Sequence, residues 1–115
     1  MATLASAFPV LPGKEEDLRQ FTEQMAGPRR SEYQASRRRL GITIERSYLQ
    51  HTPQGSIVIV YTEADHPEHL LERIAASQDA FDLWFKQQLQ HIHGVDFTQP
   101  PPGPPPELIF DQQVP

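Results

Sequence analysis

The sequence contains no cysteine, which excludes disulfides, thiolate metal sites and cysteine nucleophiles. It has no basic excess either: 10 Lys and Arg against 15 Asp and Glu give a formal net charge of −5. A dedicated nucleic-acid binder normally carries a surplus of basic residues. No run approaches the roughly 20 apolar residues of a membrane helix, and the first seven residues lack the basic start and long apolar run of a signal peptide. These absences predict a cytoplasmic globular protein with neither nucleic acid nor membrane as partner.

The chain does contain a run of five apolar or aromatic residues, from Ile57 to Tyr61. Side chains of a strand alternate between two faces, so a strand with this sequence buries both of them. A chain of 115 residues has enough helix to cover one face of a small sheet, but hardly two. We therefore predict that a second copy of the chain covers the other face and that the protein is a homodimer.

Hydrophobic periodicity and the Gly and Pro positions predict the other elements. The expected strands cover the opening residues to 11, residues 42–50 and residues 56–63. The expected helices cover residues 14–26, 28–40, 65–77 and 77–94. With a last strand at 107–111, this order is that of an α+β, ferredoxin-like βαββαβ sandwich with an antiparallel sheet and extra helical segments, in a single domain over residues 1–115.

Several residues are predicted to begin or end these helices. Asp65 is the expected cap of the third helix, with Glu68 as its reciprocal partner, and Ser77 is the expected cap of the fourth. Gly27 suits the left-handed position after the first helix, and Gly94 is the expected stop of the last.

The last part of the chain, residues 98–115, is predicted to be a proline-rich strap followed by a strand. The tract 100–106 is restricted to extended polyproline or turn conformations. The strap is expected to place Leu108-Ile109-Phe110 on a sheet edge, either of its own chain or of the partner. Its PxxP spacing also matches ligands of SH3-like grooves, which is the less favoured interpretation.

The register of the predicted hairpin is left open by the sequence. Its turn, Thr52-Pro53-Gln54-Gly55, favours a type I turn with or without a glycine bulge. A one-residue slip exchanges the faces of a strand. With the bulge, one face would carry Glu45, Leu49, His51, Ile57, Ile59, Tyr61 and Glu63; without it, the two faces exchange partners.

Five segments resemble an uncharacterised bacterial family of the dimeric α+β barrel superfamily. They are residues 27–30 (GPRR), 40–43 (LGIT), 50–55 (QHTPQG), 81–86 (FDLWFK) and 100–108 (PPPGPPPEL). The resemblance implies two ferredoxin-like subunits that press their sheets together into a barrel. That superfamily includes cofactor-independent monooxygenases of antibiotic biosynthesis, haem-degrading enzymes, lactone isomerases and stress-induced proteins. No catalytic residue of those branches transfers to this chain, so the resemblance supports an enzyme by fold analogy alone.

The hairpin carries the best polar set for catalysis. His51 is the candidate base, Tyr61 the candidate phenol that polarises a substrate, and Glu45 a candidate carboxylate. The competing interpretation is a hydrogen-bond network at the subunit contact, or residues exposed at an edge strand.

Four further residues are candidates for substrate binding. Arg46 and Tyr48 are either a candidate anion clamp for an acidic substrate or, as we favour, partners of an ion pair with a nearby carboxylate. Glu63 lies on the same hairpin. Trp84, with its aromatic neighbours at helical spacing, is either the wall of a pocket or, as we favour, core packing against the sheet.

No metal site and no cofactor are predicted. His66 and His69 are three residues apart, and His91 and His93 flank a helix end, but no third ligand has diagnostic spacing. Haem ligation by His51, His91 or His93 is less favoured still. The arginines between residues 29 and 39 are interpreted as a solvated helix face or as ion pairs to the acidic first helix.

Two functions remain open. The first is a cofactor-independent, monooxygenase-like enzyme acting on a small apolar or aromatic metabolite. The alternative is a non-catalytic dimeric module that binds a ligand or serves in stress. An open, partly polar cavity near His51 favours the enzyme, whereas a barrel filled by Leu49, Ile59 and Tyr61 favours the module.

Overall fold

The computed structural model describes residues 2–101 and 103–115 and is an α+β structure with an antiparallel sheet, as predicted. Along the chain its elements are β1 (Ala2–Pro9), α1 (Glu15–Ala26), α2 (Arg30–Arg39), β2 (Ile42–Thr52), β3 (Gly55–Ala64), a short 3-10 helix η1 (Pro67–His69), α3 (Leu70–Ala76) and α4 (Ala80–His93). Every helix and strand expected from the first residue to residue 94 has a counterpart here.

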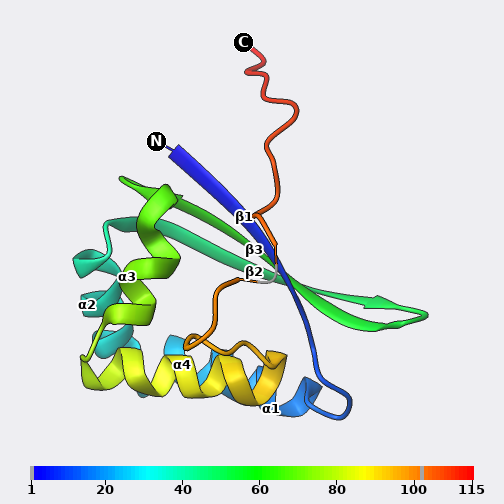
Figure 1. Cartoon of the computed structure of the whole chain (residues 1–115), viewed down its shortest axis with the longest axis vertical. Helices are drawn as coiled ribbons and strands as arrows, with labels where there is room; N and C mark the ends of the chain where they lie inside the picture. The colour runs from blue at the N-terminus through cyan, green and yellow to red at the C-terminus, as the bar shows by residue number, and fades with distance from the viewer. Residues whose placement is uncertain (1, 102) are drawn as a thin grey trace.

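The three strands form one sheet in the order β1-β3-β2, so the apolar strand β3 lies in the middle. Both neighbours run antiparallel to it. The helices of the described residues all lie on one side of the sheet, and none of them covers its other side (Figure 1). We call the uncovered side the open face.

Burial along β3 follows this arrangement. Val58, Thr62 and Ala64 point toward the helices and are buried, whereas Ile57 and Ile59 point to the open face and are only partly buried. On β1, the residues that share the open face are exposed: Thr3, Ala5, Ala7 and Pro9.

The core lies between the helices and the sheet. It is dominated by α4, whose Phe81, Phe85, Leu89 and Ile92 are all buried. From α1, Phe21 packs against the Phe85 ring with centroids 5.7 Å apart. This spacing of apolar residues is the helical stripe expected from the sequence.

Helix ends agree with the predictions in part. Gly94 ends α4 in the left-handed conformation (φ 72°), as expected. Gly27 does not adopt it (φ −122°), because α1 ends in a tight turn that leads directly into α2. Asp65 caps nothing: η1 begins after His66, without a side-chain cap. The cap of α4 is Asp79, which accepts from the Phe81 amide at 3.0 Å, and not Ser77.

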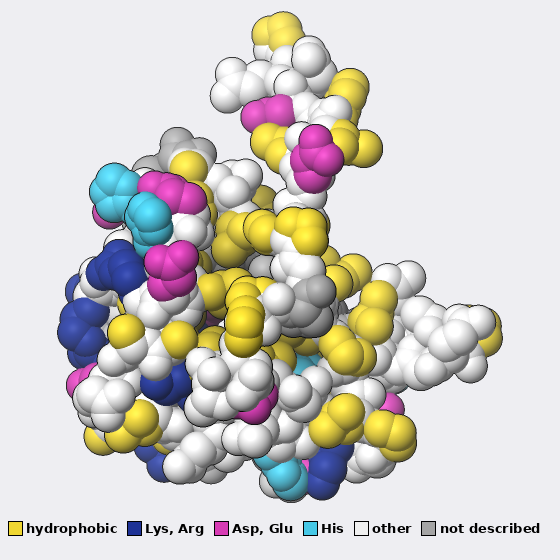
Figure 2. Space-filling view, viewed as in Figure 1, with side chains coloured by type: hydrophobic (Ala, Val, Ile, Leu, Met, Phe, Trp, Pro, Cys, Tyr) yellow, Lys and Arg dark blue, Asp and Glu magenta, His cyan; other side chains and the backbone are white. Residues whose placement is uncertain are grey.

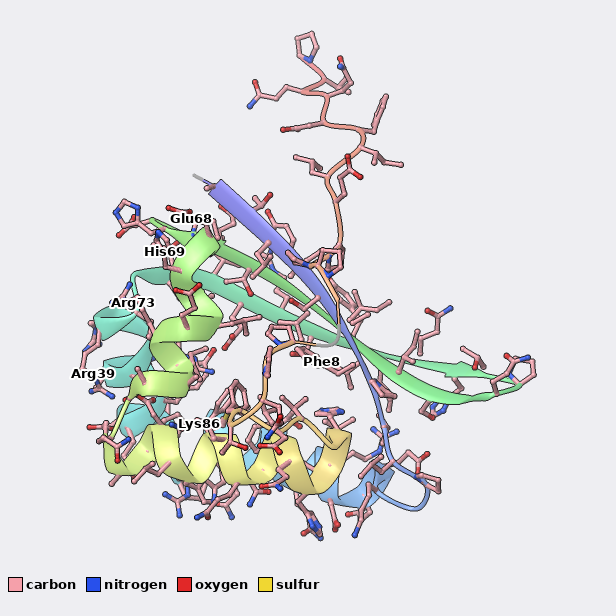
Figure 3. All side chains as sticks on the ribbon, in the orientation of Figure 1. Phe8, Arg39, Glu68, His69, Arg73 and Lys86 are labelled. Atoms are coloured by element: carbon pink, nitrogen blue, oxygen red, sulfur yellow. The ribbon has the colours of Figure 1, made fainter. Side chains whose placement is uncertain are left out.

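Two basic side chains bind the ends of other helices. Arg73 on α3 donates to the carbonyls of Arg39 and Leu40, where α2 ends. Lys86 on α4 donates to the carbonyls of Ala75 and Ser77, at the end of α3, at 2.8 and 2.9 Å (Figure 3). Each cation therefore binds carbonyls at the negative end of a helix dipole.

The C-terminal segment differs from the prediction. Residues 103–115, which we call the tail, contain no strand, so the sheet has three strands where a ferredoxin-like sandwich has four. The tail passes the β1 side of the sheet and projects away from the helices (Figure 1). An extended segment becomes a strand only where a neighbour supplies hydrogen bonds, and within the described residues of this single chain the tail has none.

Candidate functional site

The hairpin between β2 and β3 has a two-residue loop without a bulge at the turn. Thr52 pairs with Gly55, and the register continues unbroken to Arg46 opposite Tyr61. The shift in register lies at the other end of β2, between Ile42 and Ile44. This register decides which side chains share a face.

The predicted catalytic set is divided by this register. Glu45 and His51 lie on the helix-facing side of the sheet, opposite Thr62 and Ser56, whereas Tyr61 lies on the open face. The single catalytic face that the bulged hairpin would have created is therefore not present in this chain. Side chains of two paired strands cannot meet when the register places them on opposite faces of the sheet.

His51 lies at the far end of the hairpin. Its Nδ1 lies 3.0 Å from the Ser56 hydroxyl, and the side chain is exposed. It lines neither of the two grooves described below. A base needs a substrate within hydrogen-bond reach, and the hairpin tip supplies no walls to hold one.

Glu45 is instead the centre of a buried polar cluster between β2 and α2. Its Oε1 accepts from the Tyr33 hydroxyl at 2.5 Å and from Arg37 Nε at 3.1 Å. Burial, followed by the charge and hydrogen bond of Glu45, raises the pKa of Tyr33 well above its usual value. Arg37 is only 5 % exposed, and its guanidinium lies 4.3 Å from the Phe85 ring centroid.

The cluster continues from Arg37 to Asp82 on α4. Arg37 Nη1 donates to Ser36 Oγ at 3.0 Å, and Ser36 donates to Asp82 Oδ1 at 2.5 Å. Ser77 donates to the other oxygen of Asp82, also at 2.5 Å, and Arg39 Nη2 lies 3.5 Å from it. Burial disfavours the charged carboxylate, but these hydroxyls and the guanidinium outweigh it, so the pKa of Asp82 lies below its usual value.

The open face carries the other predicted residues. Tyr61 donates to Glu63 Oε2 at 2.8 Å, and this hydrogen bond is the main cause that raises the pKa of Tyr61. Arg46 stands opposite Tyr61 on β2, and Tyr48 is 58 % exposed. Among the described residues, Arg46 makes no ion pair. The predicted anion clamp therefore lies on the uncovered side of the sheet, next to the apolar side chains of β3.

The first groove, the Trp84 groove, lies between α1 and α4 and has a volume of about 380 Å³. Trp84 packs on Phe21 (centroids 5.4 Å apart), and the Arg29 guanidinium covers its ring at 4.3 Å. Trp84 is thus both core packing and groove wall, which unites the two interpretations of the sequence. The groove is lined by Asp17, Gln20, Phe21, Gln24, Arg29, Trp84, Gln88 and His91.

The second groove, the β2-edge groove, has a volume of about 460 Å³ and runs along the outer edge of β2 beside α2. The strand contributes five consecutive residues, from Ile42 to Arg46. The helix contributes Tyr33, Gln34, Arg37 and Arg38.

The histidines have structural partners. His91 lies 2.9 Å from Asp17 of α1, and the buried His93 lies 2.7 Å from the Pro9 carbonyl. Burial lowers the pKa of His93 despite that hydrogen bond. His66 and His69 are exposed beside Glu68 and Glu72. Within residues 2–101 and 103–115, no three His, Asp or Glu side chains are grouped as a metal would require.

The buried polar cluster was missed by sequence reasoning. Arg37 is one of five arginines that were interpreted together as a solvated helix face or as ion pairs to the acidic first helix, and nothing in the local sequence distinguishes it. Asp82 reads as a favourable acidic residue in the first turn of a helix. The one usable signal is Tyr33 at i and Arg37 at i+4, which place both side chains on the same side of α2.

Comparisons with protein-family models, curated proteins and solved structures find no match to this chain. Within the described part of the chain, no helix has both the length and the apolar character needed to cross a bilayer.

Proposed function

We propose that this chain is the subunit of a homodimeric, non-catalytic binding module in which two sheets pack face to face by their open faces, as in a dimeric α+β barrel. The observation that supports it is the open face itself. Ile57, Ile59, Ala5 and Ala7 lie there side by side, and no helix within residues 2–101 and 103–115 lies above them. Apolar side chains on one face of a sheet are stabilised by a second layer, which here is a second copy.

Sedimentation of the full chain tests this pairing. Ile59→Asp places a carboxylate in the middle of the open face, and Tyr48→Lys places a charge at an exposed position of the same face. Both should convert a dimer to a monomer at micromolar concentration. Leu83→Asp is the matched control, because Leu83 is a partly exposed leucine (38 %) on α4, and it should leave the dimer intact.

A wild-type chain that sediments as a monomer at micromolar concentration overturns the pairing. So does a dimer that survives both open-face variants while far-ultraviolet circular dichroism reports the native fold. Tyr48→Lys protects the test against simple unfolding, since that side chain is already 58 % exposed.

The Trp84 groove is the proposed ligand site of the module. The Arg29 guanidinium, which lies over the Trp84 ring, suits a small planar acid whose carboxylate pairs with that cation in the groove. Trp84 is the one tryptophan of the sequence, so its fluorescence reports binding directly. Benzoate, used as the probe, should change this fluorescence saturably, and Arg29→Ala should abolish the change while Arg30→Ala keeps it. An equal response of both variants refutes the site.

The monooxygenase-like enzyme is the less supported function. His51 and Glu45 lie on one side of the sheet and Tyr61 on the other, so one chain does not assemble the proposed base and phenol around a substrate. Tyr61, Glu63 and Arg46 together are a polar patch on the open face, which the pairing of two copies would cover.

A further inference from the structure

We propose that the tail of one copy docks as an added strand in the β2-edge groove of the second copy. Tail docking presupposes the homodimer proposed above. It assigns an occupant to the groove and a role to the apolar tail residues, neither of which follows from face-to-face packing alone.

The groove has a backbone edge to offer. In the order β1-β3-β2, the outer edge of β2 has no strand beside it among the described residues. Its N–H and C=O groups there are free to pair with an added strand. The groove follows this edge from Ile42 to Arg46, with α2 as its opposite wall. A segment of about five extended residues matches that length.

The groove is also positively charged. Three arginines line it, Arg37, Arg38 and Arg46, against the single carboxylate of Glu45. Glu45 is already bound by Arg37 and Tyr33. Arg38 is exposed and makes no ion pair within the described residues, whereas Arg46 lies on the open face that the partner would cover. An occupant of this groove should therefore bring acidic side chains.

The tail has the complementary composition. It carries Glu107 and Asp111 and no Lys or Arg. Between them, Leu108, Ile109 and Phe110 are 67 %, 88 % and 78 % exposed. In a strand, Glu107 and Asp111 fall on the same face, four residues apart. Figure 2 shows these hydrophobic and acidic side chains standing clear of the domain.

The position of the tail favours the groove of a second copy. The tail leaves the domain on the β1 side of the sheet, whereas the groove lies along β2, at the opposite edge (Figure 1). To reach its own β2, the tail must fold back across the open face, which is the surface assigned to the partner.

The area of the open face also favours a tail that docks on the second copy. Three strands about 4.8 Å apart and about eight residues long have a flat footprint of roughly 380 Å² per copy. Stable dimers bury about 1,200–2,000 Å² in total. The uneven surface of the side chains makes the buried area larger than this flat footprint. An exchanged pair of apolar tails would add further buried area to the interface.

Charge reversal in the full chain tests the docking. Gln34→Glu with Arg38→Glu makes the α2 wall of the groove acidic without touching the open face. Glu107→Lys with Asp111→Lys reverses the tail. Because the protein has no cysteine, Gln112→Cys accepts a single spin label that reports tail mobility. The control for the groove reversal is Arg19→Glu with Gln90→Glu. These two exposed positions lie outside both grooves, and the change in charge equals that of the groove reversal.

In the otherwise unchanged protein we expect an immobilised label. The groove-reversed chain and the tail-reversed chain should each release the tail, weakening its docking by about tenfold or more, while the control keeps it docked. Mixing the two reversed chains separates the two routes. Exchange between copies predicts that the label on the groove-reversed chain is immobilised again in the mixed dimer, because its tail then meets an unaltered groove.

Two results overturn tail docking. A label that is equally mobile in the otherwise unchanged protein and in the groove-reversed chain means that the groove is empty. A label that is immobilised in the otherwise unchanged protein but stays mobile in the mixed dimer means that each tail binds its own groove. Sedimentation of the same samples separates these failures from failure of the pairing itself, which would leave the labelled protein monomeric.

Discussion

Asp82 joins three parts of the helical layer through one buried carboxylate. It is 2 % exposed and accepts hydrogen bonds from Ser36 of α2 and from Ser77 before α4, each at 2.5 Å. Replacing it by alanine removes both bonds and the ion pair with Arg39. It also leaves the buried Ser36 hydroxyl without its acceptor.

The expected loss follows from these contacts. A hydrogen bond to a charged group contributes about 1.5–3 kcal/mol, and Ser36 and Ser77 each make one. The Arg39 side chain is 46 % exposed, so solvent screens its ion pair and reduces it to less than about 1 kcal/mol. Asp82→Ala should therefore lower the free energy of unfolding by about 3–5 kcal/mol, a large part of the roughly 5–15 kcal/mol available to such a domain.

Urea denaturation followed by Trp84 fluorescence measures this loss. The midpoint should fall by roughly 2 M, given a slope of about 1–3 kcal/mol per molar urea. The difference in stability between the unchanged protein and Asp82→Ala should shrink as the pH falls through the depressed pKa of Asp82. A protonated carboxyl no longer forms the charged hydrogen bonds and the ion pair that stabilise the fold. Glu72→Ala, at an exposed ion pair with His69, should change stability by less than about 0.5 kcal/mol. An Asp82→Ala loss as small as that of Glu72→Ala refutes the role assigned to the cluster.

Two further predictions concern acid stability and a turn. Burial lowers the pKa of His93, so protonation of this side chain favours the unfolded chain. The melting temperature should therefore fall as the pH drops below about 6.5, the pKa of His in the unfolded chain. His93→Asn should weaken this pH dependence, and an unchanged pH profile of the variant would contradict the role of His93. Gly41→Ala should cost more than Gly13→Ala in urea denaturation: both have positive φ (73° and 78°), but only the Cβ at 41 meets Asp65, 3.2 Å from Oδ2. Equal losses would contradict the contact.

Most of the fold was predictable from local signals. Hydrophobic periodicity and the Gly and Pro positions located the helices, and Gly94 marked the end of the last one, because only glycine adopts positive φ at little cost. The last strand was predicted wrongly for the single chain. Residues 107–111 have the composition of a strand, but composition does not supply the neighbour that a strand needs.

The candidate site was less predictable, for two physical reasons. Which β3 side chains share a face with Glu45 and His51 depends on a single residue at the turn, since one extra residue there exchanges every partner. The burial of Arg37 depends on how α2 lies against β2 and α4, which no spacing along the chain records. Trp84 has both of the roles that the sequence offered, core packing and groove wall, because a residue at the margin of a core also borders the surface.

In the proposed homodimer, two copies of the chain pair through the open face of the sheet. Sedimentation equilibrium of the full chain, together with the Tyr48→Lys variant, measures this most directly. Pairing predicts a particle of twice the 13.1 kDa chain mass at micromolar concentration and a folded monomer for the variant. A wild-type protein that remains a 13.1 kDa monomer under the same conditions would contradict pairing through the open face.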